Sequence, residues 1–425
     1  MRRNRFSVTP ADVHRVAHRA LSTALPWTDY KRSVTAAEVV DLLLRMAAVA
    51  GTLFAVVRRR FRFSPETARK AVHSQLPDLP TLTAGLVRAL HEVARFSRHD
   101  RKRRWRVAMD VHGVPFHGDP NTPGVAGGVK KQGAHYNFHY ATAMPIHKRR
   151  RYTVGSIACD GLKPHEIVAT LLSQLETHKL SILGVVLDSA FDSGETILLL
   201  REKKLFFTVP LRRKGVGSNN RNACFSWKRG TMGDVTWTTE TTRRTVAVRV
   251  PVWRRAGSKR QSPDGSPPPK STKRKAATGT RVKRKSSKPG TRVRAFAFEG
   301  WSDRDAVSEE RRAWLARRRY RERFGIETSY RRKNELKGWT TSCSPAYRLV
   351  LEGIGYLLRQ AWVRLTQEIA RASKLSAEAW VGGFTVADLR EQLLEHLNRI
   401  DPTRDHIPLR HNEITPYAVA WAGKR

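Results

Sequence analysis

The stretch Gly184–Asp188, GVVLD, is a short apolar run that ends in a single acid. Its length and its β-branched residues predict a strand that is buried on both faces, at the centre of a sheet. A second apolar run, Arg106–Asp110 (RVAMD), also ends in an acid and alternates as a strand does. Because an ionised carboxylate among apolar side chains is costly unless it is paired or bound to a metal, each acid requires a partner.

The segments around these two runs predict a mixed sheet. Three strands are followed by a helix, a strand, a second helix and a further strand, which is the order of a meander joined to βαβ crossovers. The other elements are expected as strands at 139–146, 151–159 and 205–211 and as helices at 164–180 and 193–203. The expected fold class is therefore α/β, with a ribonuclease-H-like mixed sheet as its core.

The regions on either side of this core differ in character. Residues 1–100 predict short basic helices, which form either a DNA-binding domain or a plain helical bundle. Residues 213–299 predict a β-rich insertion, whose basic tract 254–294 is expected to be disordered without DNA. The catalytic core is expected at 101–212 and 300–345, and a helical C-terminal region at 346–425.

The charge of the chain indicates a polyanionic partner. The 425 residues include 80 Lys+Arg and 37 Asp+Glu, which gives a formal net charge of +43. DNA is the leading candidate, because neutralisation of phosphates releases counterions and rewards such a surface. An acidic membrane surface is the alternative, but no long basic helix with a clean apolar face supports it.

Several classes of protein are disfavoured by what the sequence contains. Cys159, Cys224 and Cys343 form no CxxC pair, which argues against a disulfide framework or a structural zinc site. The most apolar segment, Met46–Val57, is too short to span a bilayer. No GKS or GKT motif is present, so ATP use is not expected. We expect a cytoplasmic protein that is associated with the nucleoid.

A third acid lies in the segment Tyr320–Glu327, YRERFGIE, which is strongly basic and predicts a helix. Tyr320, Arg323 and Glu327 are spaced three and four residues apart, so they share one helical face. A carboxylate beside a phenol and a guanidinium suits an acid that holds a metal next to a phosphate. Taken alone, the segment favours a solvated, ion-paired helix, since charge runs usually face water.

Asp110, Asp188 and Glu327 together form an all-oxygen set of the kind that Mg²⁺ or Mn²⁺ prefers. Two such ions could activate a water or a 3′-hydroxyl and stabilise the leaving oxygen of a phosphoryl displacement. The alternative for the two strand acids is a role in a turn or a helix cap. Asp119, in the Gly/Pro/Asn-rich loop expected at 118–128, is the first alternate for an active-site acid.

Three motifs resemble those of the insertion-sequence DDE transposases that carry a Tyr-x2-Arg-x3-Glu-x6-Lys signature. They are AMDVHGVPFHGD around Asp110, VVLDSAFDS around Asp188 and YRERFGIETSYRR around Glu327. The resemblance extends from about Trp105 to Gln360, which is more than half of the chain.

This resemblance implies a ribonuclease-H-like fold with a β-rich insertion before the helix that carries the glutamate. It implies two divalent ions held by Asp110, Asp188 and Glu327. The implied activity is cleavage of transposon ends and strand transfer into target DNA, carried out by a homodimer. Tyr320 and Arg323 match family residues that grip the DNA end.

The chain departs from the signature at its last position. The lysine should follow the glutamate by seven residues, and Asn334 stands there instead. Lys333 is adjacent but points away from the Glu327 face of a continuous helix, whereas Arg331 lies on that face. Either the helix is interrupted near Arg331 or Arg331 takes the role of the lysine, so both residues are candidates for binding DNA.

Two functions of other classes compete with the transposase interpretation. One is a catalytically inactive DNA-binding protein derived from a transposase. The other is a stand-alone Mg²⁺-dependent nuclease that cuts DNA without joining it.

Overall fold

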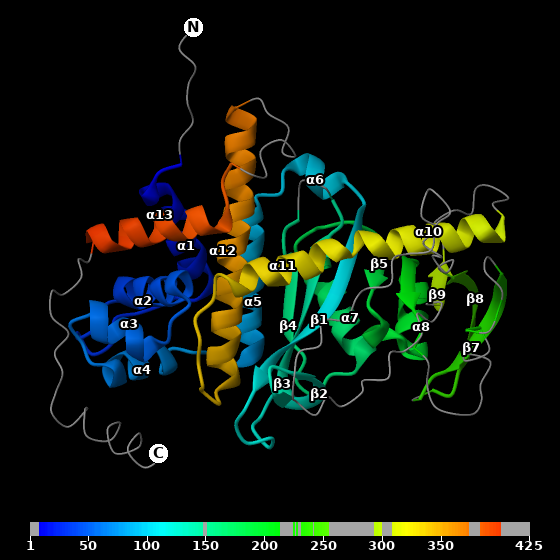
Figure 1. The fold of residues 1–425 in the computed structure, drawn as a ribbon, viewed down its shortest axis with the longest axis horizontal. Coiled ribbons are helices and arrows are strands. Elements are labelled where there is room, and N and C mark those ends of the chain that lie inside the picture. Colours follow the sequence, from blue (N-terminus) through cyan, green and yellow to red (C-terminus); the bar gives the residue numbers. More distant parts are fainter. Residues whose placement is uncertain are drawn as a thin grey trace, which may run out of the picture.

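The computed structural model describes residues 8–147, 151–212, 224–225, 227, 231–240, 242–254, 293–299, 308–373 and 383–400. Most of the basic tract expected at 254–294 therefore lies outside the described residues, as does the end of the expected C-terminal region. Within the described ranges, a large mixed sheet stands beside a helical bundle, and a long helical rod runs across the sheet and reaches the bundle at α12 (Figure 1).

Within the described part of the chain, nine strands form one sheet. Its order is β2-β3-β1-β5-β6-β9-β8-β7, with β4 paired to β3 off this path. The strands are β1 (Trp105–Phe116), β2 (Val125–Lys131), β3 (Ala134–Pro145), β4 (Gly155–Ala158), β5 (Ile182–Leu187), β6 (Phe206–Pro210), β7 (Met232–Thr238), β8 (Thr245–Arg254) and β9 (Val293–Glu299).

The centre of the sheet combines antiparallel and parallel pairing. β1 is antiparallel to β3 and parallel to β5, and β5 is parallel to β6. Two helices supply the crossovers, α7 (Pro164–Thr177) before β5 and α8 (Gly194–Glu202) before β6. Their apolar stripes are buried in one cluster with the strands, as the periodicity of the sequence indicated. The expectation of a mixed α/β fold is confirmed.

The expectation of a loop over 118–128 was partly wrong. β2 begins at Val125 and pairs with β3, so that β1, β2 and β3 extend together as a long ribbon (Figure 1). Gly127 and Gly128 weaken the local preference for a strand. The pairing is instead supplied by β3, which is long enough to hold β1 on one side and β2 on the other.

The strands of the expected insertion continue the sheet. β9 pairs antiparallel with β6, β8 with β9, and β7 with β8. Apolar residues of β7 and β8 belong to the same buried cluster as β1 and β5. The described insertion strands are therefore part of the same hydrophobic core as the central strands.

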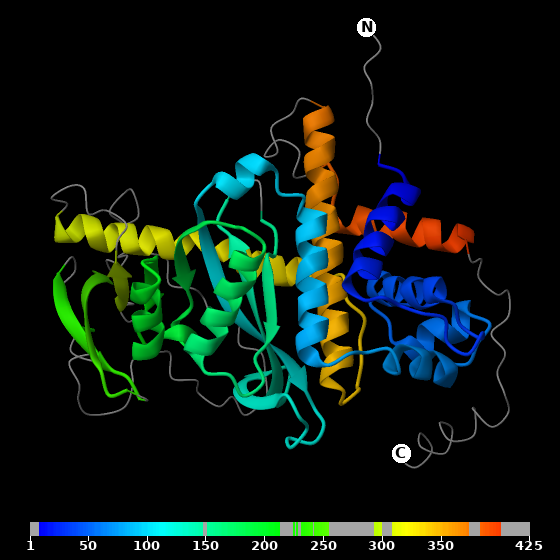
Figure 2. The same cartoon turned by 180° about the vertical axis from the view of Figure 1, so that it is seen from behind.

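Helices from the two ends of the chain share a second hydrophobic core. α5 and α12 lie side by side in both views, and α13 packs across α1 and α2 (Figures 1 and 2). Hydroxyl side chains cap two of the helices, Thr35 at the start of α2 and Ser64 at the start of α4. The helices are α1 (Pro10–Ala24), α2 (Ala36–Val49), α3 (Leu53–Arg60), α4 (Pro65–His73), α5 (Leu79–Ala94), α6 (Arg98–Lys102), α12 (Pro345–Ala372) and α13 (Val386–Ile400).

The rod consists of α10 (Glu309–Glu322) and α11 (Phe324–Asn334), which follow one another almost in line (Figure 1). Arg323 joins them with φ −63° and ψ −25°, which are helical values, so the chain direction hardly changes. α10 packs on β5, β6, β8 and β9, while α11 contacts β1 and α12. The rod thus connects the sheet to the helical bundle.

No helix in the described ranges combines the length and the apolar character that crossing a bilayer requires.

A glycine in β5 allows the two parallel strands to approach closely. A Cβ atom at Gly184 would lie 2.3 Å from the carbonyl oxygen of Phe206 in β6. We expect Gly184→Ala to lower the free energy of unfolding by about 1–3 kcal/mol, measured by chemical denaturation. Gly127→Ala is the control, because nothing lies within 4 Å of its Cβ position. Equal denaturation midpoints for the two variants would contradict the close packing of β5 on β6.

Candidate active site

The two strand acids lie where the parallel pairing of β1 with β5 ends. Met109 of β1 is in register with Leu187 of β5, so Asp110 and Asp188 are the next residues on the two chains. Asp110 is 6% exposed, and Asp188 is partly exposed just beyond the end of β5. Asp188 directly follows β5, as expected of a strand that ends in an acid, whereas Asp110 lies within β1, which continues to Phe116.

The rod supplies the third acid and a guanidinium. Tyr320, Arg323 and Glu327 lie on one face of α10 and α11, as their spacing predicted, and this face is turned toward the strand acids. Arg323 is only 6% exposed and Tyr320 only 8%. The face is therefore directed into the protein, and its acid is not part of a fully solvated basic helix.

Arg323 forms ion pairs with all three acids. Its Nη1 lies 2.8 Å from Oδ2 of Asp110, and its Nη2 lies 2.8 Å from Oε1 of Glu327 and 3.6 Å from Oδ1 of Asp188. Nη2 also donates a hydrogen bond of 3.2 Å to Oη of Tyr320, which donates one of 3.3 Å to Oδ1 of Asp188. One guanidinium thus holds the acids of two strands and a helix together.

The negative charge of this cluster exceeds its positive charge. Burial raises the pKa of Asp110 to about 7, although Arg323 opposes the rise and the other two carboxylates add to it. Burial alone would lower the pKa of Arg323, but the surrounding carboxylates, Asp110 first, raise it instead. Three carboxylates around one guanidinium leave a site that a further cation would stabilise.

The carboxylate oxygens suit a hard divalent cation, but Arg323 occupies the position between them. In the described residues, no group of three or more His, Cys, Asp or Glu side chains is arranged to hold a metal ion. The reason is that each acid contacts the guanidinium that lies between them. The position at which the carboxylates meet already holds a cationic group, and all the nearby acceptors are oxygens, which is what Mg²⁺ or Mn²⁺ requires.

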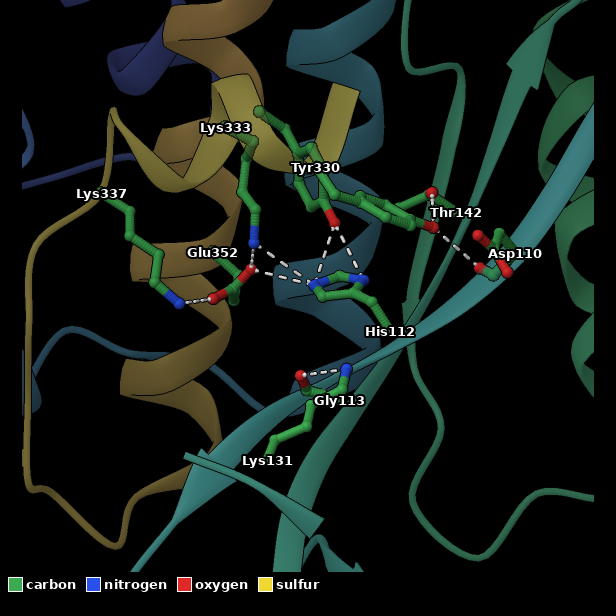
Figure 3. A network of polar contacts seen from close by, with 10 residues as sticks. Asp110, His112, Gly113, Lys131, Thr142, Tyr330, Lys333, Lys337 and Glu352 are labelled. Atoms are coloured by element: carbon green, nitrogen blue, oxygen red, sulfur yellow. Dashed lines mark hydrogen bonds and ion pairs between the residues drawn. The ribbon is translucent and has the colours of Figure 1, made fainter. Parts of the chain in front are cut away.

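Tyr330 holds the backbone of Asp110 in place, a role that the sequence did not indicate. Its Oη donates a 3.0 Å hydrogen bond to the carbonyl oxygen of Asp110 and lies 2.8 Å from Oγ1 of Thr142 on β3 (Figure 3). Tyr330 follows Glu327 by three residues, so the same helical spacing that identified Arg323 could have identified it. It fixes the middle of β1 against α11.

The two candidates for the last DNA contact have different positions. α11 continues without interruption to Asn334, and Arg331 is exposed on it. Lys333 is completely buried, and its ammonium forms an ion pair with Glu352 of α12. The proposal that Lys333 binds phosphate therefore needs correction, because its charged end is enclosed between α11 and α12.

Lys333 belongs to a buried polar network. Glu352 accepts from Lys333 and Lys337, and His112 of β1 lies within 3.3 Å of both Lys333 and Glu352 (Figure 3). Burial lowers the pKa of Lys333 to about 8 and that of His112 to about 4. Although burial raises the pKa of Glu352, the two lysines hold it well below its ordinary range.

The position of Asp119 supports a structural role. Its carboxylate accepts a hydrogen bond of 2.9 Å from the backbone of Asn121, and the side chain is exposed in the loop after β1. This is the turn geometry that the sequence indicated.

Comparison with known proteins adds little to this geometry. No family model matches the sequence, and no curated protein matches it. Among solved structures, a chain of the piggyBac transposase synaptic complex with hairpin DNA, determined by cryo-electron microscopy, aligns with a TM-score of 0.46 and 10% identity. The alignment covers 100% of this chain and 86% of that chain. A similarity at this level does not establish a shared function.

The raised pKa of Asp110 makes stability depend on pH in metal-free buffer. Since the pKa rises from an ordinary 3.8 to about 7, the folded protein holds a proton that the unfolded chain releases between these values. This contribution to stability is complete below pH 3.8 and is lost as the pH rises through 7. Its slope is at most about 1.4 kcal/mol per pH unit.

The test compares the unfolding free energies of the unmodified protein and of Asp110→Asn, which has no carboxyl group to titrate. We expect the value for the unmodified protein, minus that of the variant, to fall between pH 4 and 7 and then to level off. A difference that does not change with pH would contradict the buried position of this carboxyl group.

Removing the charge of Glu352 should destabilise the buried polar network. Glu352→Gln leaves the ammonium of Lys333 buried without a counter-charge, so we expect a loss of about 3–5 kcal/mol in the free energy of unfolding. The double variant Glu352→Gln with Lys333→Met removes both charges and should recover a large part of that loss. If the double variant were less stable than Glu352→Gln alone, the assignment of Lys333 to this network would be wrong.

Proposed function

We propose that the protein is a DDE transposase with a ribonuclease-H-like core, which cleaves transposon ends and transfers the strands into target DNA. The observation that carries the proposal is the meeting of Asp110, Asp188 and Glu327, from two parallel strands and a helix, around one cationic group. The antiparallel β3–β1 pair followed by parallel β5 and β6 supports the same core. The net charge of +43 supports DNA as the substrate.

Asp110, Asp188 and Glu327 are the residues that would hold the divalent ions. A pair of Mg²⁺ or Mn²⁺ ions supplies activation of the attacking oxygen and stabilisation of the leaving oxygen in such phosphoryl transfers. Asp110 is held in place through its backbone by Tyr330, and Asp188 through its side chain by Tyr320. These hydrogen bonds fix the two strand acids before any substrate binds.

The proposed role of the basic residues is to bind the phosphates of the DNA end. When DNA binds, Arg323 would exchange the carboxylates for a phosphate, and Tyr320, to which it donates a hydrogen bond, would lie beside that phosphate. Arg331, exposed on the same rod, takes the role of the missing signature lysine, whose position is held by Asn334. Lys333 is left out of this set because it is buried.

Several parts of the proposal extend beyond the site. Homodimerisation, action in the cytoplasm at the nucleoid and independence from ATP are proposed on the basis of the resemblance and of the sequence. A catalytically inactive DNA-binding descendant and a nuclease that does not join DNA are the competing functions. The cluster of acids favours an enzyme over the first, because three converging carboxylates are costly to keep without a use.

Strand cleavage tests the proposed chemistry. The substrate is a supercoiled plasmid that carries the DNA flanking the gene, with a second plasmid as the target. With Mg²⁺, we expect end cleavage and joined products, and we expect Asp188→Asn to reduce both at least about 100-fold, since it removes one of three metal ligands. Asp119→Asn is the control and should retain activity.

The outcomes separate the competing functions. Cleavage without joined products would favour the nuclease. Binding without cleavage by the unmodified protein would favour the inactive descendant. Equal cleavage by Asp188→Asn and the unmodified protein would contradict the assignment of the acids.

Arg323 should compete with metal for the carboxylates. In the absence of DNA, a divalent ion has to displace the guanidinium from the acids that it bridges. We therefore expect Arg323→Gln to bind Mn²⁺ at least about tenfold more tightly in calorimetry, because removing the competing cation lowers the cost of binding. Arg331→Gln, on the exposed side of α11, is the matched control and should leave the affinity unchanged. Weaker Mn²⁺ binding by Arg323→Gln would contradict this competition.

A further inference from the structure

A cavity of about 790 Å³ lies beside the candidate active site, between the far end of β1 and the segment that leads from α11 to α12. His112, two residues beyond Asp110 on β1, forms part of its wall. Three cationic residues also line it: Lys131 of β2, Lys337 between α11 and α12, and Arg348 of α12 (Figure 3 shows Lys131 and Lys337). The three acids of the candidate active site do not line this cavity.

The cavity carries an excess of positive charge. Among the residues that line it, Glu352 is the only carboxylate, set against Lys131, Lys337 and Arg348. Glu352 is already shared between Lys337 and the buried Lys333. The single carboxylate of Glu352 is therefore set against four cationic side chains, the three that line the cavity and the buried Lys333.

The remaining contacts of these cations are to neutral groups. Nζ of Lys131 donates a 3.2 Å hydrogen bond to the carbonyl oxygen of Gly113. Arg348 donates to the carbonyl oxygens of Ser342 and Thr340 and lies over the rings of Phe116 and Phe138. Such contacts orient the side chains without cancelling their charge, so the cavity favours an anion.

We propose that this cavity is a second phosphate-binding site, which holds the backbone of DNA that extends past the active site. The choice of DNA as the source of the phosphate rests on the proposed function. Trp339, which is 53% exposed and also lines the cavity, lies where it would contact the bound strand. The cavity thus extends the DNA path from Asp110 along β1 toward the ribbon of β2 and β3.

Lys131 allows a clean test because its neighbour provides a matched control. Both Lys130 and Lys131 are exposed on β2, but only Lys131 lines the cavity. The affinity for a short single-stranded oligonucleotide is measured in EDTA, without metal, over a range of salt concentrations. We expect Lys131→Gln to reduce the slope of log K against log salt by about 0.7, the value for one lost phosphate contact on a single strand. Lys130→Gln should leave it unchanged.

A second readout reports the position of the DNA directly. With 5-iodouracil in the oligonucleotide, we expect a photochemical crosslink to Trp339 that Lys131→Glu weakens at least about fivefold and Lys130→Glu does not. Equal salt slopes for the two glutamine variants, or crosslinks elsewhere but not at Trp339, would overturn the proposal. A change in Trp339 fluorescence on adding inorganic phosphate, with no effect of Lys131→Gln on DNA binding, would show a site for free anions and overturn it as well.

These measurements do not depend on catalysis. If cleavage fails but the salt slope responds to Lys131, the proposed enzyme is wrong and the phosphate site stands. If Asp188 is needed for cleavage but Lys130 and Lys131 are equivalent, the enzyme stands and the site is wrong.

Discussion

The ion pairs of Arg323 with three carboxylates determine how the rest of the molecule is arranged. A carboxylate as buried as Asp110 is tolerated only beside a cation, and the cation comes from a helix rather than from the sheet. The rod of α10 and α11 therefore crosses the sheet where the pairing of β1 with β5 ends. The parallel register of these two strands brings their acids to one place, and the helical geometry at Arg323 keeps Tyr320 and Glu327 on the same face.

A second cluster of charges ties this arrangement to the helical bundle. Glu352 of α12 holds Lys333 and Lys337, so the end of the rod is fixed to the longest helix. Space for the Lys333 side chain comes from Gly355, where a Cβ atom would lie 3.0 Å from two carbons of the lysine. Because His112 joins this cluster from β1, the strand that carries Asp110 contacts the rod at two points, Arg323 and Lys333.

Much of the candidate site could be predicted from sequence because its signals are local. The apolar runs before Asp110 and Asp188 identified strands, and the three- and four-residue spacing of Tyr320, Arg323 and Glu327 identified a shared face. The sequence could not place Arg323 among the carboxylates, since that contact joins elements far apart in the chain.

The failures have the same origin. Lys333 is buried because Glu352 and Gly355 lie opposite it on α12, and no pattern within α11 indicates this. β2 forms because β3 offers it an edge, although its own glycines argue against a strand. The shared core of the N-terminal helices with α12 and α13 likewise depends on contacts between distant segments.

We propose that Asp110, Asp188 and Glu327 form a metal site, whose position Arg323 occupies until substrate binds. The most direct test is a crystal structure with Mn²⁺ and DNA from the end of the element, with anomalous scattering used to locate the metal. We expect anomalous peaks between the three carboxylates, with Arg323 moved onto a phosphate. Well-ordered DNA with no peak between the acids, and Arg323 still bound to all three, would contradict it.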